Sequence, residues 1–288
     1  MDQASSEIAV VRPSLFREFC RNKLGIVGLL VVIAFIGVAV FAPVVAAYDP
    51  YLTRPEMRLK PPSREYMLGN DELGRDLASR LIYGARVSLL FGIVTTSVAT
   101  VVGTLLGVIA GYFGGALDNT IMRFMDLLLA FPGVLLAIAV VSILGPGLVN
   151  SMIAVGIHAV PIFARTVRAT TLSVRERDYV MAAKALGLPS YLVIWRHVLP
   201  NTIAPVIVLV TMQVGTAILS ASTLSFLGLG VTRPTPEWGA ILAGGRDYIR
   251  SAPHVTLFPG IALSTVVIGF SALGDALRDA LDPKLRHV

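Results

Sequence analysis

Long apolar runs are the feature that most restricts how this chain folds. Five stretches are long enough to be membrane-spanning helices, since about 20 residues at about 1.5 Å each cross a hydrocarbon core of about 30 Å. A shorter sixth stretch, at 148–163, contains His158 and Pro161, and we include it because the flanking spans otherwise have the wrong relative orientation. The predicted spans are Leu24–Ala46, Val87–Tyr112, Leu127–Leu144, Leu148–Phe163, Ile203–Leu224 and Leu257–Leu277.

Composition supports an all-α integral membrane protein. Of the 288 residues, 55% are hydrophobic and 15% are charged, whereas soluble domains carry about 25% charged residues. The net charge of +6 fits loops rich in Lys and Arg better than nucleic-acid binding, because no motif combining basic and aromatic residues is present. Cys20 is the only cysteine and excludes an intrachain disulfide, and the four His are too dispersed to predict a metal site.

Six spans place both termini on one side of the membrane. Lys and Arg are in modest excess on that side, which is typical of the cytoplasmic side. The predicted organisation is therefore a cytoplasmic segment, a first span, an extracytoplasmic loop, a core of five further spans with a cytoplasmic loop at 169–200, and a cytoplasmic tail. The boundaries of the five parts are 1–23, 24–46, 47–86, 87–277 and 278–288.

The cytoplasmic loop is too charged to cross a bilayer comfortably. Ser173 and Glu176 have the spacing of a capping box, which predicts that a helix begins there and runs to Leu186. Gly187 followed by Pro189 predicts its end, because glycine adopts the left-handed conformation of a helix cap and proline cannot extend the turn.

A second short helix is predicted at Tyr191–Val198, capped by Ser190 and ending before Pro200. The first helix carries small residues, including Ala182 and Ala183, beside apolar and charged ones. Such a helix suits a groove on a partner protein, and the alternative is an interfacial helix that rests on lipid headgroups.

Two motifs in this loop resemble the EAA loop of ATP-binding-cassette importer permeases. They are "AAKALG" at Ala182–Gly187 and "RHVLPN" at Arg196–Asn201. Met181 occupies the position where the family has glutamate, so any contact of that carboxylate is absent or replaced. The resemblance implies a coupling helix that docks on an ATPase subunit. The residues implied in coupling are Tyr179, Met181, Ala182, Ala183, Lys184, Gly187, Leu199 and Pro200.

Four longer stretches are similar to the dipeptide and oligopeptide branch of that family, specifically its C-type subunit. They are Leu68–Leu89, Phe131–Val141, Ser220–Leu242 and Leu273–Arg286. The resemblance implies a six-helix type I importer permease fold in a bacterial cytoplasmic membrane. It also implies four partner subunits: a homologous second permease, two cytoplasmic ATPases and an extracytoplasmic substrate-binding protein. Peptides are the expected substrate, with glutathione, nickel complexes or another small solute as alternatives.

The chain has no G-x-x-x-x-G-K-[ST] phosphate loop, so we expect a non-catalytic subunit that binds no cofactor itself, with ATP and Mg bound by the ATPases. A secondary transporter is the rival interpretation, but internal repeats and paired broken helices with ionisable residues are not evident. An intramembrane enzyme is a second rival, and no H-E-x-x-H, G-x-S-x-G or paired carboxylates lie within a predicted span.

Polar residues give two further sets of candidates. Because hydrocarbon makes polar groups costly, those in the fifth span either face a translocation pathway or bond to neighbouring helices. These are Gln213, Ser220 and Ser222. Residues of the outer loops either dock the binding protein or brace the permease dimer. These are Asp71, Arg75, Asp76, Glu237 and Trp238.

Overall fold

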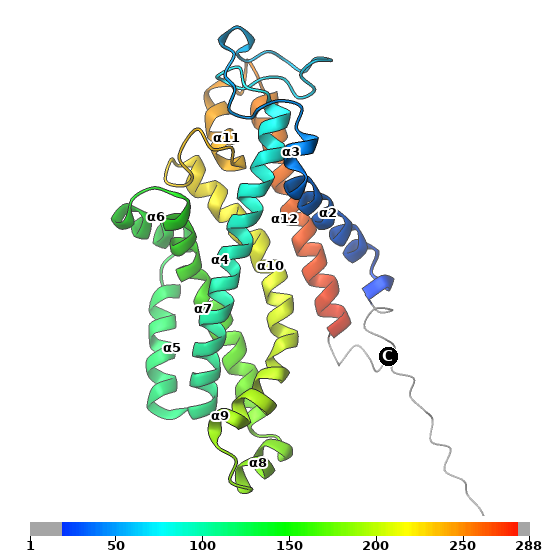
Figure 1. Cartoon of the computed structure of the whole chain (residues 1–288). Coiled ribbons are helices and arrows are strands. Elements are labelled where there is room, and N and C mark those ends of the chain that lie inside the picture. The colour runs from blue at the N-terminus through cyan, green and yellow to red at the C-terminus, as the bar shows by residue number, and fades with distance from the viewer. Residues whose placement is uncertain (1–18, 282–288) are drawn as a thin grey trace, which may run out of the picture.

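The computed structural model describes residues 19–281, and this part of the chain is an elongated helical bundle without a β-strand (Figure 1). Five helices are long and apolar enough to cross a membrane, the fourth of them counted with the short turns that precede it. The five are α2 (Lys23–Val40), α4 (Leu77–Phe113), α7 (Leu148–Arg175), α10 (Leu199–Phe226) and α12 (His254–Leu281).

The predicted span at Leu127–Leu144 is not one continuous helix. Its residues belong to two helices, α5 (Gly115–Leu129) and α6 (Gly133–Leu144), which meet at an angle of 92°. The break falls at Pro132, which has no N–H to donate and disfavours helical backbone in the residue before it. Pro132 itself is extended, with ψ at 131°. Together the two helices form one broken span or a re-entrant loop.

Two helices extend beyond the apolar runs that predicted them. The helix α4 begins ten residues before Val87, because the Asp76 carboxylate accepts a hydrogen bond from the Ser79 backbone N–H (2.7 Å) and caps it. The helix α7 passes through Pro161 and ends at Arg175, twelve residues after Phe163. Proline is tolerated inside membrane helices where surrounding groups satisfy the backbone.

Close approach of α4 and α7 depends on glycine. Gly103, Gly107 and Gly111 share one face of α4, and a Cβ atom built on Gly103 would lie 2.5 Å from the Phe163 Cβ. On Gly107 it would lie 2.5 Å from the Ala164 carbonyl oxygen. The spacing of four residues therefore does what small residues do in membrane helices, which is to bring two backbones together.

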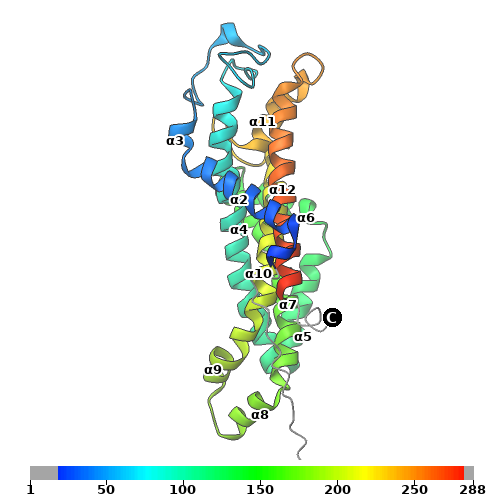
Figure 2. The ribbon, with the colours of Figure 1, turned by 90° about the vertical axis from the view of Figure 1, so that its right-hand side faces the viewer.

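The remaining elements lie at the two ends of the bundle (Figure 2). At one end are α3 (Ala42–Val45), η1 (Pro55–Met57), α11 (Trp238–Gly245) and η3 (Arg246–Tyr248). At the other end are α8 (Asp178–Ala185), α9 (Ser190–Val193) and the π-helical turn η2 (Ile194–Val198).

The start of α2 and the end of α12 point toward the end of the bundle that carries α8 (Figure 1). They are joined by a hydrogen bond from Asn22 Nδ2 to Asp279 Oδ2 (3.2 Å). This agrees with termini on the same side as the predicted coupling loop. The predicted N-terminal segment and C-terminal tail fall mostly outside the described residues.

Candidate functional site

The helix α8 is the predicted coupling helix, but it begins later than expected. Ser173 belongs to α7 and Glu176 caps its carboxyl end, so the predicted capping box is wrong. The side chain of Val174 is buried, and Arg175 donates through Nη1 to the carbonyl oxygens of Gly111 (3.1 Å) and Tyr112 (3.2 Å). These contacts with the end of α4 hold α7 helical past the point where the local motif favours a new start.

One face of α8 is anchored to the bundle. Val180 and Ala183 are buried and pack in a cluster with Val174 of α7, Val193 of α9 and Tyr112 of α4. The end of α4, the end of α7 and the helix α9 therefore fix the orientation of α8. Burial of small and β-branched side chains lets these elements approach closely.

The carboxyl end of α8 is a Schellman motif, as predicted from Gly187. The φ angle of Gly187 is +79°, in the left-handed region. Its N–H donates to the Lys184 carbonyl (2.9 Å), and the Leu188 N–H donates to the Ala183 carbonyl (3.2 Å). A Cβ atom at Gly187 would meet nothing within 4 Å, so glycine is needed here for its backbone angle and not for space.

The opposite face of α8 and its neighbours present large apolar side chains to the surroundings. Tyr179 and Met181, both predicted coupling residues, are 41% and 51% exposed, and Ala182 is exposed beside them. Leu186 is 81% exposed, and Tyr191 and Trp195 are each 72% exposed. We name these six residues the apolar tip. Tyr191 and Trp195 were not among the predicted coupling residues, although their spacing of four residues places both on one helical face.

Three other predicted coupling residues lie beside the tip. The Lys184 ammonium is 4.7 Å from the centroid of the Tyr112 ring, so it turns back toward α4. Leu199 and Pro200 form the first turn of α10. The predicted helix end before Pro200 is wrong: η2 continues directly into α10, and a wider π turn at this point relieves the clash of a proline ring with the preceding turn.

Among the predicted pathway residues, Ser220 lines a cavity. The cavity has a volume of about 240 Å³ and lies between α6, α7 and α10. Thr216 and Ser220 of α10 line it together with His158 of α7, whose buried Nδ1 atom has no hydrogen-bond partner. Gln213 is buried, and Ser222 donates to the Glu237 carboxylate (3.1 Å) outside the cavity.

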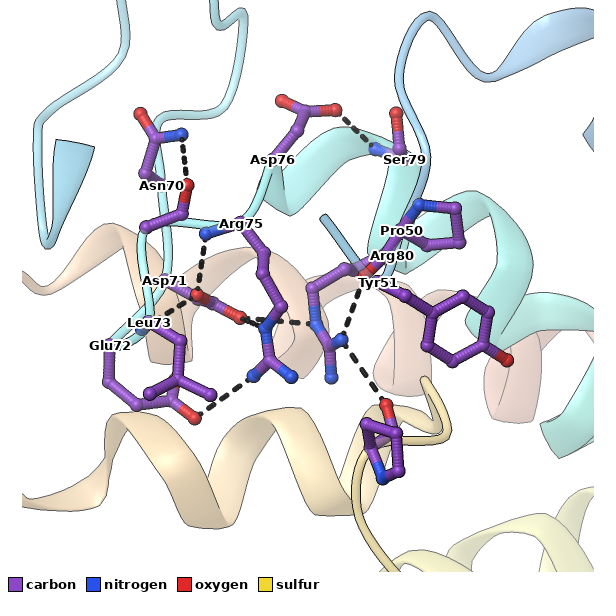
Figure 3. Close-up of polar contacts among 12 residues, drawn as sticks. Pro50, Tyr51, Asn70, Asp71, Glu72, Leu73, Arg75, Asp76, Ser79 and Arg80 are labelled. Atoms are coloured by element: carbon purple, nitrogen blue, oxygen red, sulfur yellow. Dashed lines mark hydrogen bonds and ion pairs between the residues drawn. The ribbon is translucent and has the colours of Figure 1, made fainter. Parts of the chain in front are cut away.

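A buried group of charges organises the opposite end of the molecule (Figure 3). Asp71 accepts hydrogen bonds from the Leu73 and Arg75 backbone N–H groups and forms ion pairs with Arg75 Nε (2.7 Å) and Arg80 Nε (3.2 Å). Arg80 also donates to the carbonyl oxygens of Pro50 (3.0 Å) and Pro234 (3.4 Å). These ion pairs and hydrogen bonds connect the outer loop to α4 and to the segment before α11.

The predicted docking residues are therefore interior. Asp71, Arg75 and Asp76 are at most 5% exposed. Glu237 caps α11 through the N–H groups of Gly239 and Ala240, and Trp238 Nε1 donates to the Leu81 carbonyl (3.0 Å). All five side chains are buried, so other residues form the exposed surface of this end.

Two exposed cations lie at the same end of the molecule as these buried residues. Arg233 and Arg246 line a hollow of about 480 Å³ between the end of α10 and α11, and they are 61% and 64% exposed at the side chain.

Comparison with known proteins identifies the family. Residues 103–287 match the model of the binding-protein-dependent transport system inner membrane component, and residues 14–62 match the N-terminal membrane domain of oligopeptide transport permease C. The chain belongs to this permease family. It is 49% identical over 271 residues to the dipeptide transport system permease protein DppC of Alkalihalophilus pseudofirmus, covering 94% of this chain and 89% of that protein.

Two further similarities agree with this permease family. The chain is 45% identical over 273 residues to the glutathione transport system permease protein GsiD of Escherichia coli, covering 94% and 90% of the two chains. A solved structure of the MetNI methionine ABC transporter in an inward-facing conformation shares the fold, with a TM-score of 0.58 at 19% identity over 72% of this chain and 98% of that one. The secondary-transporter and enzyme alternatives find no support in these matches.

Proposed function

We propose that this permease is one of two membrane subunits of an ATP-driven peptide importer and transmits ATPase closure to the pathway through α8. The apolar tip carries the proposal. Large apolar side chains exposed on a firmly anchored helix mark an interaction surface, and hot spots of such surfaces are rich in aromatic residues. The partners are two ATPases that bind ATP and Mg, a second permease and an extracytoplasmic binding protein.

Movement of the tip has a direct route into the bundle. The buried face of α8 is packed against α7, α4 and the turn that leads into α10. A rigid connection of this kind lets closure of the ATPases bias one of two bundle packings that differ by a few kcal/mol. The cavity beside Ser220, Thr216 and His158 is our candidate for this subunit's half of the translocation pathway.

The proposed membrane is the bacterial cytoplasmic membrane, with both termini and α8 in the cytoplasm. The side shared by α8 and the described helix ends supports this orientation. The exposed Arg233 and Arg246, on the opposite side, are our replacement candidates for contact with the binding protein. Peptides are the proposed substrate, in line with the names of the relatives, and glutathione, itself a tripeptide, is the second candidate.

Co-purification and transport together test this function. The tagged chain, expressed with its neighbouring genes and purified in mild detergent, is expected to recover a second permease and two ATPase chains. The complex is then reconstituted in vesicles, with the binding protein and a labelled dipeptide outside. We expect the dipeptide to accumulate inside only when ATP is present on the side of the membrane where the ATPases lie. Recovery of the chain as a lone oligomer that transports without ATP would overturn the proposal.

A further inference from the structure

A groove on the side of the bundle has the features of a lipid site. It lies between α7, α10 and α12, has a volume of about 720 Å³, and is separate from the cavity beside Ser220. Its floor is α10, from Asn201 to Met212, and Arg177 and Arg278 line it from the start of α8 and the last turn of α12. We propose that this groove binds one anionic phospholipid, with the phosphate between the two guanidinium groups.

The length of the apolar wall matches one leaflet. Asn201 to Met212 extends about 16 Å along the helix at about 1.5 Å per residue, and half of a hydrocarbon core is about 15 Å. The four lining residues of α10 between these ends are all apolar, and α12 adds the apolar Leu281. The four are Ala204, Pro205, Val208 and Leu209. The hydroxyl of Thr166 donates to the Ile162 carbonyl of its own helix (2.9 Å), so its hydrogen does not need an acceptor on a molecule bound in the groove.

Arg177 and Arg278 are the two cations that line the groove. Within residues 19–281 neither Arg177 nor Arg278 forms an ion pair with a carboxylate. Arg278 is favourable in the last turn of α12, because cations stabilise the carboxyl end of a helix. Arg177 precedes the first turn of α8, where the same dipole is unfavourable for a cation.

Charge and shape thus point to a single kind of occupant. Two guanidinium groups that form no ion pair within residues 19–281 and an apolar wall one leaflet long fit an amphiphile with a phosphate head, and basic pockets between membrane helices at the cytoplasmic side are typical of such lipids. Because Arg177 directly precedes α8, the headgroup would contact the coupling loop. The lipid site depends on the membrane-spanning fold and not on the identity of the transported substrate.

Native mass spectrometry of the full chain, purified with its co-purifying subunits and stripped of lipid, tests the site. We expect one phosphatidylglycerol molecule to be retained about tenfold or more better than phosphatidylcholine with the same acyl chains. The double variant Arg177→Gln/Arg278→Gln is expected to lose this preference, and Arg177→Lys/Arg278→Lys to keep most of it. Arg196→Gln removes an exposed cation outside the groove and serves as the matched control.

Three results of this comparison would overturn the proposal, and a fourth comes from the separated chain. They are equal retention of the two lipids by the native protein, an unchanged preference in the double Gln variant, and loss of preference in the control as well. If the separated chain retains the lipid but the assembled complex does not, the groove is an interface between subunits and the lipid assignment is wrong. Elution of each variant at the native volume on a sizing column separates loss of lipid from loss of fold.

Discussion

The two ends of the bundle solve different problems with different chemistry. The outer end ties its loop down with buried charges, in which Asp71 alone accepts from two backbone N–H groups and pairs with two arginines. The inner end anchors α8 with small apolar residues and leaves Leu186, Tyr191 and Trp195 exposed. The outer end holds most of its charges inside the chain and exposes the cations Arg233 and Arg246, whereas the inner end exposes apolar surface for a partner.

The largest loss of stability is expected from Asp71→Ala, which removes the central carboxylate of the outer end. It leaves Arg80 buried without the carboxylate it pairs with and leaves Arg75 with Glu72 alone, and removing one partner of a buried ion pair costs about 3–5 kcal/mol. We expect a large fall in the Tm of the purified protein, measured by fluorescence-detected size exclusion after heating. Asp247→Ala, which removes an exposed pair with Arg246, is the control and should change the Tm little.

At the inner end, loss of exposed side chains is expected to weaken partner binding without lowering the Tm. Trp195→Ala combined with Leu186→Ala is expected to leave the Tm unchanged and to weaken recovery of the ATPase chains at least tenfold, since interface anchors contribute about 2 kcal/mol or more each. Quantitative pull-down from a tagged permease measures this. Leu257→Ala, at an exposed residue away from the tip, should leave recovery unchanged. A large Tm loss without loss of ATPase recovery would make the tip structural.

A smaller effect separates the backbone of the inner end from its side chains. Gly187→Val places a β-branched residue at a φ of +79°, which costs about 1–2 kcal/mol and shifts the angle between α8 and its neighbours. We expect ATP hydrolysis to continue while peptide uptake falls. Gly187→Asn should restore much of the uptake, because Asn adopts the left-handed region more readily. Normal uptake in the Val variant would show that the turn does not set the coupling.

The smallest expected effect is at the outer end. Ser222→Ala removes one of the donors to Glu237, which still accepts from the N–H groups of Gly239 and Ala240. Net loss of one neutral donor to a charged group costs about 1.5 kcal/mol, which is a Tm change of a few degrees at most for a chain of this size. A loss as large as that of Asp71→Ala would mean that Glu237 belongs to the same cooperative unit.

Sequence patterns predicted what is local and apolar. Four of the six spans and the left-handed turn at Gly187 follow from length, hydropathy and the properties of glycine, and the span at 148–163 was included because of the orientation of its neighbours. All of these are confirmed in the described residues. The bend at Pro132 was missed because apolar residues flank it on both sides, so hydropathy runs through the break.

Long-range contacts explain the other differences. Arg175 bonds to the end of α4, more than sixty residues earlier, and keeps α7 helical through Ser173. The burial of Asp71, Arg75 and Arg80 arises because segments distant in sequence, including Pro50 and Pro234, close over them. A charged loop looks exposed in a sequence, because nothing local records which remote carbonyl groups will cover it.

The π turn before Pro200 joins α9 to α10, so residues Ser190–Phe226 form a single helix of 37 residues. At about 1.5 Å per residue this rod is about 55 Å long, greater than the thickness of the hydrocarbon core. A rotation of about 5° around its midpoint would move each end by about 2 to 3 Å in opposite directions. If the helix moves as one body, a push on Tyr191 arrives at Ser222 as a displacement of opposite sense, and the π turn and Pro205 are the points where bending would absorb it.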